Sequence, residues 1–151
     1  MLDNLPIDVW VDDRKLGVAQ PSLCLFHKSP AIGGQFLEAL AELKQNGCPG
    51  KRTLTFAPSS RKKAIGKLTL SFVAASDDLK VMNVQCQRDT ATIRFTSDGL
   101  ALLVAAFTSW LGGAEDFGVS PRHSPLDARQ LGKLDLESGE VWFWGPGYVA
   151  P

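Results

Sequence analysis

Residues 91–113, ATIRFTSDGLALLVAAFTSWLGG, contain the pattern that decides the fold. The first six residues alternate between apolar and polar side chains, which predicts a strand with one buried face. Ser97 or Asp98 then supplies a helix N-cap, and apolar residues recur at helical spacing until Gly112-Gly113 ends the run. A strand that leads into an amphipathic helix predicts a sheet with a helix packed against it.

The first half of the chain shows a similar order of elements. Residues 7–11 alternate and predict a strand, and a second apolar run follows at 23–26. Ser29-Pro30 is typical of a helix N-cap with proline in the first turn, and Gly47 suits the left-handed position after a helix. Two further strands are expected at 53–56 and 67–73.

The second half repeats this order around residues 91–113. Its other expected strands lie at residues 81–87, 117–120, 134–136 and 141–144. Gly66-Lys67-Leu68 also matches Gly132-Lys133-Leu134. We therefore predict an α+β fold of tandem, pseudo-duplicated ββαββ units, about 5–75 and 79–148, in a single domain over 1–151. An antiparallel sheet, continuous or split into two abutting sheets, carries two helices packed on one face. Chance similarity within α+β folds is the alternative to duplication.

The overall charge argues against a nucleic-acid partner. The chain has 151 residues, of which 44% are hydrophobic, so it can bury a sizeable core. Sixteen Lys and Arg balance sixteen Asp and Glu, whereas nucleic-acid binders usually show a basic excess. We therefore expect no nucleic acid. A local basic patch is expected to be a solvated loop and comprises Lys51, Arg52, Arg61, Lys62 and Lys63.

The cysteines and the apolar runs predict a cytoplasmic protein. Cys24, Cys48 and Cys86 show no paired spacing, which is typical of free thiols in a reducing compartment. Residues 1–13 lack the features of a signal peptide. The longest apolar run, residues 100–107, is much shorter than the ~20 residues of a membrane span, so no membrane partner is expected.

The sequence offers little for catalysis or metal binding. Its two histidines are His27 and His123, and no Cys or His spacing is typical of a metal site. Cys24 lies near His27 in sequence, but strand alternation sends the two side chains to opposite faces. We therefore predict a non-catalytic binding protein without cofactor or metal.

Tryptophans beside carboxylates distinguish the surface that the helices leave open. Such a composition is common at interface hot spots. Alternatively, Trp142 and Trp144 pack beneath a loop, and Trp10 belongs to a small satellite cluster. The candidate partner-binding residues are Asp8, Trp10, Asp12, Glu140, Trp142, Trp144 and Tyr148. Polar residues expected on the same open face are Thr53, Thr55, Thr69, Ser71, Asn83, Gln85, Gln87, Thr92, Arg94 and Thr96.

Residues 91–113, together with residues 131–146, LGKLDLESGEVWFWGP, resemble small immunity proteins of bacterial antagonistic toxin systems. These proteins are the cognate inhibitors of polymorphic or type VI secreted effectors. The shared pattern covers residues 91–146: a strand, a short cap, an apolar helix, then an acidic turn that runs into an aromatic-rich strand. The resemblance implies that the chain binds a toxin made in the same cell and blocks its active site or its assembly.

Two other functions are compatible with the same pattern. Aromatic residues on an open sheet also suit base stacking in a single-stranded RNA-binding sheet. Charge separates that function from protein binding, because the expected face carries only Arg94 among basic groups and at least three carboxylates. A cleft between the two halves could instead hold a small molecule or an enzymatic site. A free sheet edge could also pair two copies as a homodimer.

Overall fold

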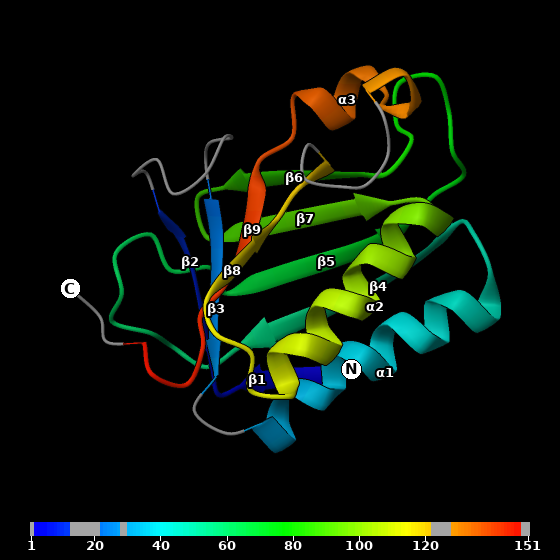
Figure 1. Ribbon diagram of the computed structural model, residues 1–151. Helices are drawn as coiled ribbons and strands as arrows, with labels where there is room; N and C mark the ends of the chain where they lie inside the picture. Colours follow the sequence, from blue (N-terminus) through cyan, green and yellow to red (C-terminus); the bar gives the residue numbers. More distant parts are fainter. Residues whose placement is uncertain (1, 13–21, 28–29, 122–127, 149–151) are drawn as a thin grey trace.

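The computed structural model describes residues 2–12, 22–27, 30–121 and 128–148. The protein has an α+β fold, as predicted (Figure 1). The elements of the first half are β1 (Leu2–Leu5), β2 (Ile7–Asp12), β3 (Ser22–His27), α1 (Pro30–Asn46), β4 (Gly50–Phe56) and β5 (Lys67–Phe72). Those of the second half are β6 (Met82–Gln87), β7 (Thr90–Phe95), α2 (Ser97–Leu111), β8 (Phe117–Val119), α3 (Lys133–Leu136) and β9 (Glu140–Phe143), with a 3₁₀ turn at Ala128–Gln130.

The strands form two separate sheets. The larger sheet has the order β1-β4-β5-β7-β6, and the smaller sheet has the order β2-β3-β9-β8. Each half contributes one hairpin to each sheet, and the hairpins of the two halves meet at the parallel pairs β3–β9 and β5–β7. Exchanging the two halves leaves this pairing scheme unchanged. The arrangement is therefore compatible with two ββαββ units.

The prediction of purely antiparallel pairing needs correction. The pairs within hairpins are antiparallel, but β1–β4, β3–β9 and β5–β7 are parallel, so both sheets are mixed. The reason lies in the connections, because the chain changes sheets through a helix in each half, from β3 through α1 to β4 and from β7 through α2 to β8. Strand β1 was not expected from the sequence, and it extends the larger sheet beside β4.

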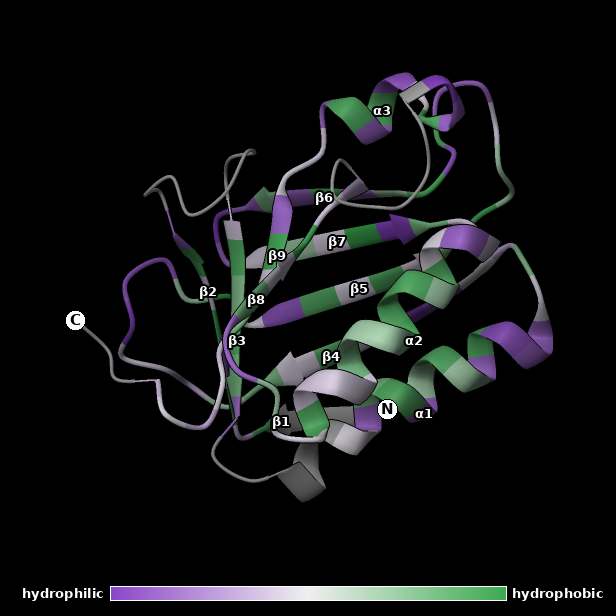
Figure 2. Ribbon diagram, in the orientation of Figure 1, coloured by the Kyte–Doolittle hydropathy of each residue, from purple (hydrophilic) through white to green (hydrophobic). Residues whose placement is uncertain are grey.

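The helices α1 and α2 pack on one face of the larger sheet, as predicted, and the smaller sheet covers the same face (Figure 1). Hydrophobic residues line the sides of both helices that face inward (Figure 2). Phe36 of α1 stacks on Phe107 of α2 with ring centroids 4.6 Å apart, and Phe143 of β9 meets Phe107 edge-on at 5.0 Å. The core therefore joins both helices to both sheets, and neither the two long helices nor the smaller sheet covers the opposite face of the larger sheet.

The N-cap of α2 is Thr96, not Ser97 or Asp98. Thr96 is extended, with φ −93° and ψ −175°, and its Oγ1 accepts a hydrogen bond from the Gly99 backbone N–H. Ser97 and Asp98 already belong to the helix. Thr96 is consequently buried instead of outward-facing. The predicted cap of α1, Ser29, lies outside the described residues.

Both predicted helix ends are confirmed by their glycines. Gly47 follows α1 with φ 80°, and Gly113 follows α2 with φ 89°. These left-handed conformations are costly for residues with a Cβ atom, so the chain can turn sharply at both points.

Residues 134–136 form helix α3 and do not start a strand. Their apolar–polar alternation suggested a strand, but Asp135 is fully buried and turns its carboxylate toward the edge of β6. There it accepts backbone hydrogen bonds from Lys80 at 2.6 Å, Val81 at 3.0 Å and Met82 at 2.8 Å. The match between Gly66-Lys67-Leu68 and residues 132–134 is therefore not structural, because Lys67 begins a strand and Lys133 a helix.

The outer edge of β2 is also covered, in this case by the loop that precedes β5. The Val11 N–H donates to the Lys63 carbonyl at 3.1 Å, and the Ile65 N–H donates to the Val9 carbonyl at 2.7 Å. Open strand edges invite pairing with other chains, so α3 and this loop both protect the sheets from edge-to-edge association.

Candidate functional site: an aromatic strip on the smaller sheet

Aromatic side chains dominate the outer face of the smaller sheet. Alternation along β9 sends Val141 and Phe143 into the core and turns Trp142 outward. Trp144, which directly follows β9, continues the same outward row. We use the name aromatic strip for Trp10, Trp142, Trp144, Tyr148 and Arg61.

The four rings of the aromatic strip form one continuous stack. Trp142 stacks on Trp144 with centroids 5.8 Å apart, and Trp144 stacks on Tyr148 at 4.6 Å. Tyr148 in turn stacks on Trp10 at 5.8 Å. The angles between successive ring planes are 27°, 22° and 18°, so the rings are nearly parallel. Each ring thus limits the rotamers of the next.

Arg61 closes one end of the stack. Its guanidinium carbon lies 4.0 Å from the centre of the Trp10 ring, within the range of a cation–π contact. Its Nε donates a hydrogen bond to Asp8 Oδ2 at 3.2 Å, which fixes the guanidinium over the ring. Sequence reasoning placed Arg61 in a solvated basic loop. No local signal marks it, because the contact depends on where that loop returns to β2.

A tight turn brings Tyr148 into the stack. Pro146 and Gly147 occupy the central positions of this turn, which the Tyr148 N–H closes by donating to the Gly145 carbonyl at 3.0 Å. Trp144 is held at its backbone by its own N–H to Leu25 O at 2.9 Å and by Trp110 Nε1 to its carbonyl at 3.0 Å. The tail is therefore anchored to both β3 and α2.

The strip is partly buried against itself and partly open to solvent. Trp10 is only 6% exposed, whereas Trp142, Trp144 and Tyr148 are half-buried. Trp142 lies flat over Gly118 of β8, where an added Cβ would fall 2.6 Å from the indole ring. The indole N–H groups of Trp142 and Trp144 are buried and have no hydrogen-bond partner. Buried donors without an acceptor cost free energy, so the isolated chain leaves two hydrogen bonds of the strip unmade.

The predicted ring of carboxylates around the tryptophans is not observed. Asp8 borders the strip through Arg61. Asp12 and Glu140 lie one row further along the sheet, on either side of Ser22. They are 9% and 0% exposed, respectively, so neither presents a surface carboxylate beside the rings. Sequence alternation identified their face of the strand correctly but not their burial.

The polar strand residues predicted on the same face belong to the other sheet. They occupy the uncovered face of the larger sheet, which we call the open face. On β4, β5, β6 and β7 the residues of the open face are Lys51, Thr53, Thr55, Lys67, Thr69, Ser71, Asn83, Gln85, Gln87, Thr90, Thr92 and Arg94. Two of them, Ser71 and Asn83, are buried, and the others are exposed or partly exposed. The tryptophans and this polar surface are therefore two separate regions.

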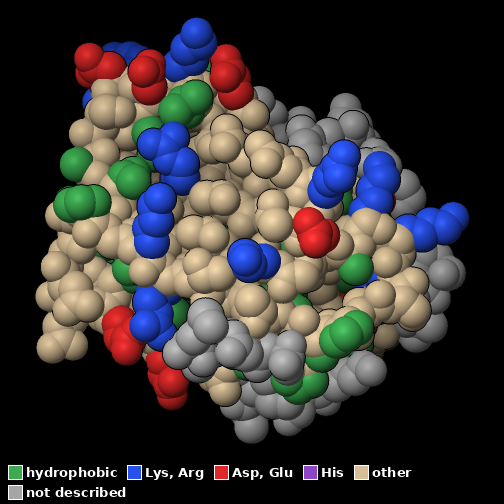
Figure 3. All heavy atoms as spheres, turned by 180° about the vertical axis from the view of Figure 1, so that it is seen from behind, with side chains coloured by type: hydrophobic (Ala, Val, Ile, Leu, Met, Phe, Trp, Pro, Cys, Tyr) green, Lys and Arg blue, Asp and Glu red, His purple; other side chains and the backbone are tan. Residues whose placement is uncertain are grey.

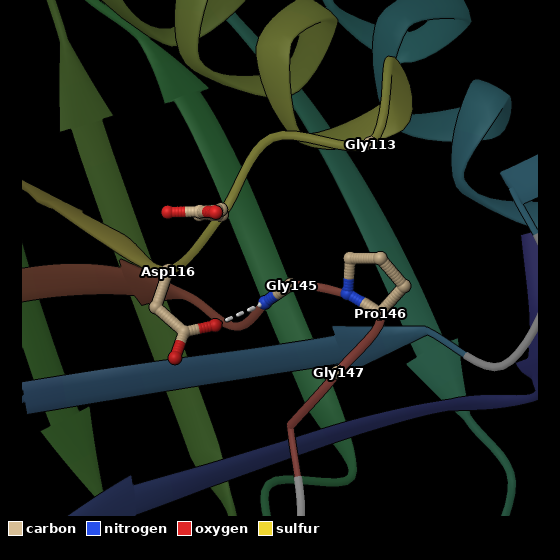
Figure 4. Close-up of a pocket in the computed structure, with 6 residues that line it drawn as sticks. Gly113, Asp116, Gly145, Pro146 and Gly147 are labelled. Carbon is tan, nitrogen blue, oxygen red and sulfur yellow. Dashed lines mark hydrogen bonds between the residues drawn. The ribbon is translucent and has the colours of Figure 1, made fainter.

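A hollow of about 500 Å³ adjoins the tail that carries Tyr148. It is lined by Gly113, Glu115, Asp116, Gly145, Pro146 and Gly147 (Figure 4). Asp116 Oδ1 accepts a hydrogen bond from the Gly145 N–H at 2.6 Å, and Glu115 is exposed. The C-terminal end of α2, whose last turn has no basic residue, adds partial negative charge nearby. The hollow therefore favours a cationic group over an anionic one.

Among the residues that the structure describes, His27 does not meet a cysteine in this region. His27 packs edge-on against Trp110 in the core at 4.5 Å, while Cys24 points to the outer face of the sheet. Burial raises the pKa of the Cys86 thiol to about 11, which disfavours its reactive thiolate. His123 lies outside the described residues. Within the parts of the chain that the structure describes, no cluster of three or more potential metal ligands occurs.

Among the helices of the described segments, none has both the length and the apolar character needed to cross a membrane. No family model, curated protein or solved structure matches the chain.

Proposed function

We propose that the chain is a cytoplasmic, non-catalytic binding protein that docks on a protein partner through the aromatic strip. In the form that the sequence resemblance implies, the partner is a bacterial toxin, and the chain acts as its immunity protein. The observation that carries the proposal is the continuous stack of Trp142, Trp144, Tyr148 and Trp10, closed by Arg61, on an outer sheet face.

The residue types of the strip suit protein recognition. Trp, Tyr and Arg are the residues most enriched among interface hot spots. Because each ring is already held by its neighbours, binding would cost little additional side-chain entropy. The partnerless N–H groups of Trp142 and Trp144 offer a further gain, since acceptors from a partner would satisfy them if the rings shifted on binding.

The neighbouring hollow indicates what the partner presents. Glu115 and Asp116 lie beside the tail that joins Trp144 to Tyr148. A partner surface with an apolar centre and a basic side chain at its rim would meet both the strip and the hollow. Such charge complementarity mainly improves specificity and the rate of association.

The two alternative functions receive less support from this region. A base-stacking sheet needs phosphate-binding cations near its aromatic rings, whereas Arg61 is already engaged with Asp8 and the adjoining hollow is acidic. An enzyme needs convergent polar groups in a pocket, and the hollow is lined largely by glycines, with Asp116 already bonded to the backbone.

A pull-down with the tagged full chain as bait tests the proposal. We expect one stoichiometric protein that is lost from the Trp142→Ala/Trp144→Ala bait. Because that double variant could lose stability, Glu115→Lys provides a second bait that leaves the stack intact and should weaken capture of a basic partner. Glu38→Lys is the matched control, since Glu38 is an exposed carboxylate on α1, away from the strip.

The captured protein must then be toxic when expressed alone and harmless when the chain is co-expressed. Toxicity that the wild-type chain relieves and the double variant does not relieve would support the immunity function. Capture that survives in both the Trp142→Ala/Trp144→Ala and the Glu115→Lys baits, with their folding verified by circular dichroism, would rule out the strip and the adjoining hollow as the binding surface.

A further inference from the structure

The open face of the larger sheet concentrates positive charge although the chain as a whole is neutral. On β4, β5, β6 and β7 its charged residues are Lys51, Lys67 and Arg94, and none of the twelve outward residues of these four strands is a carboxylate. Figure 3 shows this side of the molecule, where Lys and Arg side chains are spread over the surface and most Asp and Glu side chains lie toward the margins.

The strand register spreads these cations across a flat polar surface. Lys51 of β4 and Arg94 of β7 flank Ser71 of β5 in one row, which places them roughly 10 Å apart at the usual strand spacing. Lys67 lies four residues from Ser71 along β5, or roughly 13 Å away. Hydroxyl groups fill the space between them, including Thr69, whose Oγ1 lies 3.5 Å from that of Thr53.

The rim adds both signs of charge. Exposed Lys62 precedes β5, and the turn before β7 carries Arg88 and Asp89 at the end of the sheet where Lys67 lies. At the opposite end, Asp77 pairs with Lys80 at 3.7 Å. The described carboxylates of the rim thus lie in the connecting turns, and β4, β5, β6 and β7 present only cations and neutral polar groups on this face.

We propose that the open face binds the phosphodiester backbone of a nucleic acid without reading its sequence. Lys, Arg, Ser, Thr, Asn and Gln are the side chains that contact phosphates and sugars, and apart from the buried Ser71 and Asn83 such residues form the exposed or partly exposed surface of β4, β5, β6 and β7 on this face. A protein partner fits less well, because protein interfaces have apolar or aromatic centres and this face has neither. The absence of aromatic rings also removes base stacking, which leaves the backbone as the recognised feature.

This site is distinct from the aromatic strip and does not depend on the proposed protein partner. The sequence predicted no nucleic-acid partner because the chain as a whole has no basic excess and because the face expected to carry Arg94 also carried the carboxylates of β2 and β9. The structure places those carboxylates on the smaller sheet, and among the described side chains of β4, β5, β6 and β7 none on the open face is a carboxylate.

Fluorescence anisotropy with labelled oligonucleotides tests the proposal on the full chain. Three phosphate contacts predict that affinity for single strands falls about 20-fold between 50 and 200 mM KCl, and for duplex DNA about 40-fold. Dissociation constants of about 1–100 µM are expected near physiological salt. Parallel titrations with single-stranded DNA, single-stranded RNA and duplex DNA show which kind of nucleic acid binds most tightly.

Each of three single variants should remove one phosphate contact: Lys51→Gln, Lys67→Gln and Arg94→Gln. The affinity for single strands should then fall only about 7-fold between 50 and 200 mM KCl. Lys44→Gln is the matched control, because Lys44 is an exposed cation on α1 on the other side of the sheet. Absence of salt-dependent binding to all three oligonucleotides at 50 mM KCl would overturn the proposal. The proposal would also be overturned if Lys44→Gln weakened the salt dependence of binding as much as the three open-face variants do.

Discussion

The outer face of the smaller sheet and the open face of the larger sheet follow the same pleat but differ in exposure. Cys24 points outward from the smaller sheet, yet it is 0% exposed because it lies in register between Trp10 and Trp142. Thr92 occupies a comparable central position on the larger sheet and is half-buried. Alternation therefore fixes the direction of a side chain, whereas the size of its cross-strand neighbours decides whether solvent reaches it.

This difference predicts that the stability of the larger sheet depends on contacts at its edge, whereas that of the smaller sheet depends on packing over its outer face. Asp135→Ala should have the largest effect, lowering the free energy of unfolding by roughly 3–5 kcal/mol. It removes the acceptor for the N–H groups of Lys80, Val81 and Met82, just before and at the start of β6, and leaves them without a partner. Urea denaturation followed by circular dichroism measures the loss.

Glu137→Ala is the matched control for Asp135→Ala, because it removes an exposed carboxylate next to the same short helix. It should change stability by less than about 0.5 kcal/mol. Equal, small losses in the two variants would mean that the edge of β6 does not need Asp135.

The outer faces themselves are compared by a second pair of variants. Trp144→Ala should cost roughly 3 kcal/mol, because it removes stacking on both Trp142 and Tyr148 together with the area that the ring buries. Thr92→Ala, on the open face, should cost no more than about 0.5 kcal/mol. Thermal unfolding of both variants tests the contrast. Similar losses at the two positions would remove the distinction between a packed and a solvated outer face.

The regular elements could be predicted from the sequence because their signals are local. Alternation in residues 7–11 located β2, and helical spacing with a terminal glycine located both long helices. Assignment of strands to sheets could not be predicted in the same way. Periodicity tells which side chains share a face of a strand, but it carries no information on which strand lies beside it.

The unpredicted parts of the site depend on contacts between distant segments. The sequence predicted Asp135 within a strand. It gave no sign of the hydrogen bonds that hold this residue, because their donors lie up to 55 residues earlier in the chain. In the sequence Arg61 is indistinguishable from a solvated basic residue, because only the folded path of its loop places it over Trp10. The tryptophans were identified because their residue type is informative in itself, whereas the burial of Glu140 depends on its surroundings.

The inward face of the larger sheet provides a pH-dependent test. Burial raises the pKa of Cys86 from 9.0 to about 11, so the unfolded chain releases this proton at a lower pH than the folded chain. The resulting stability is fully present below pH 9 and is lost as the pH rises through 11, by about 3 kcal/mol in total. Cys86→Ala should lose this component of the pH dependence. Identical slopes in wild type and variant between pH 9 and 11 would contradict it.

The smallest expected effect compares two glycines, one in each region. Gly118→Ala should cost about 1–2 kcal/mol, because the new Cβ would fall 2.6 Å from the Trp142 ring and force the stack to shift. Gly66 directly precedes β5 of the larger sheet, and a Cβ added there would lie 3.9 Å from its nearest neighbour, the Asp89 carbonyl oxygen. Gly66→Ala should therefore leave stability nearly unchanged. Tryptophan fluorescence should change in Gly118→Ala and remain unchanged in Gly66→Ala. An unchanged spectrum and stability in Gly118→Ala would mean that Trp142 is free to move, and the strip would then lack the rigidity that makes it suitable for binding.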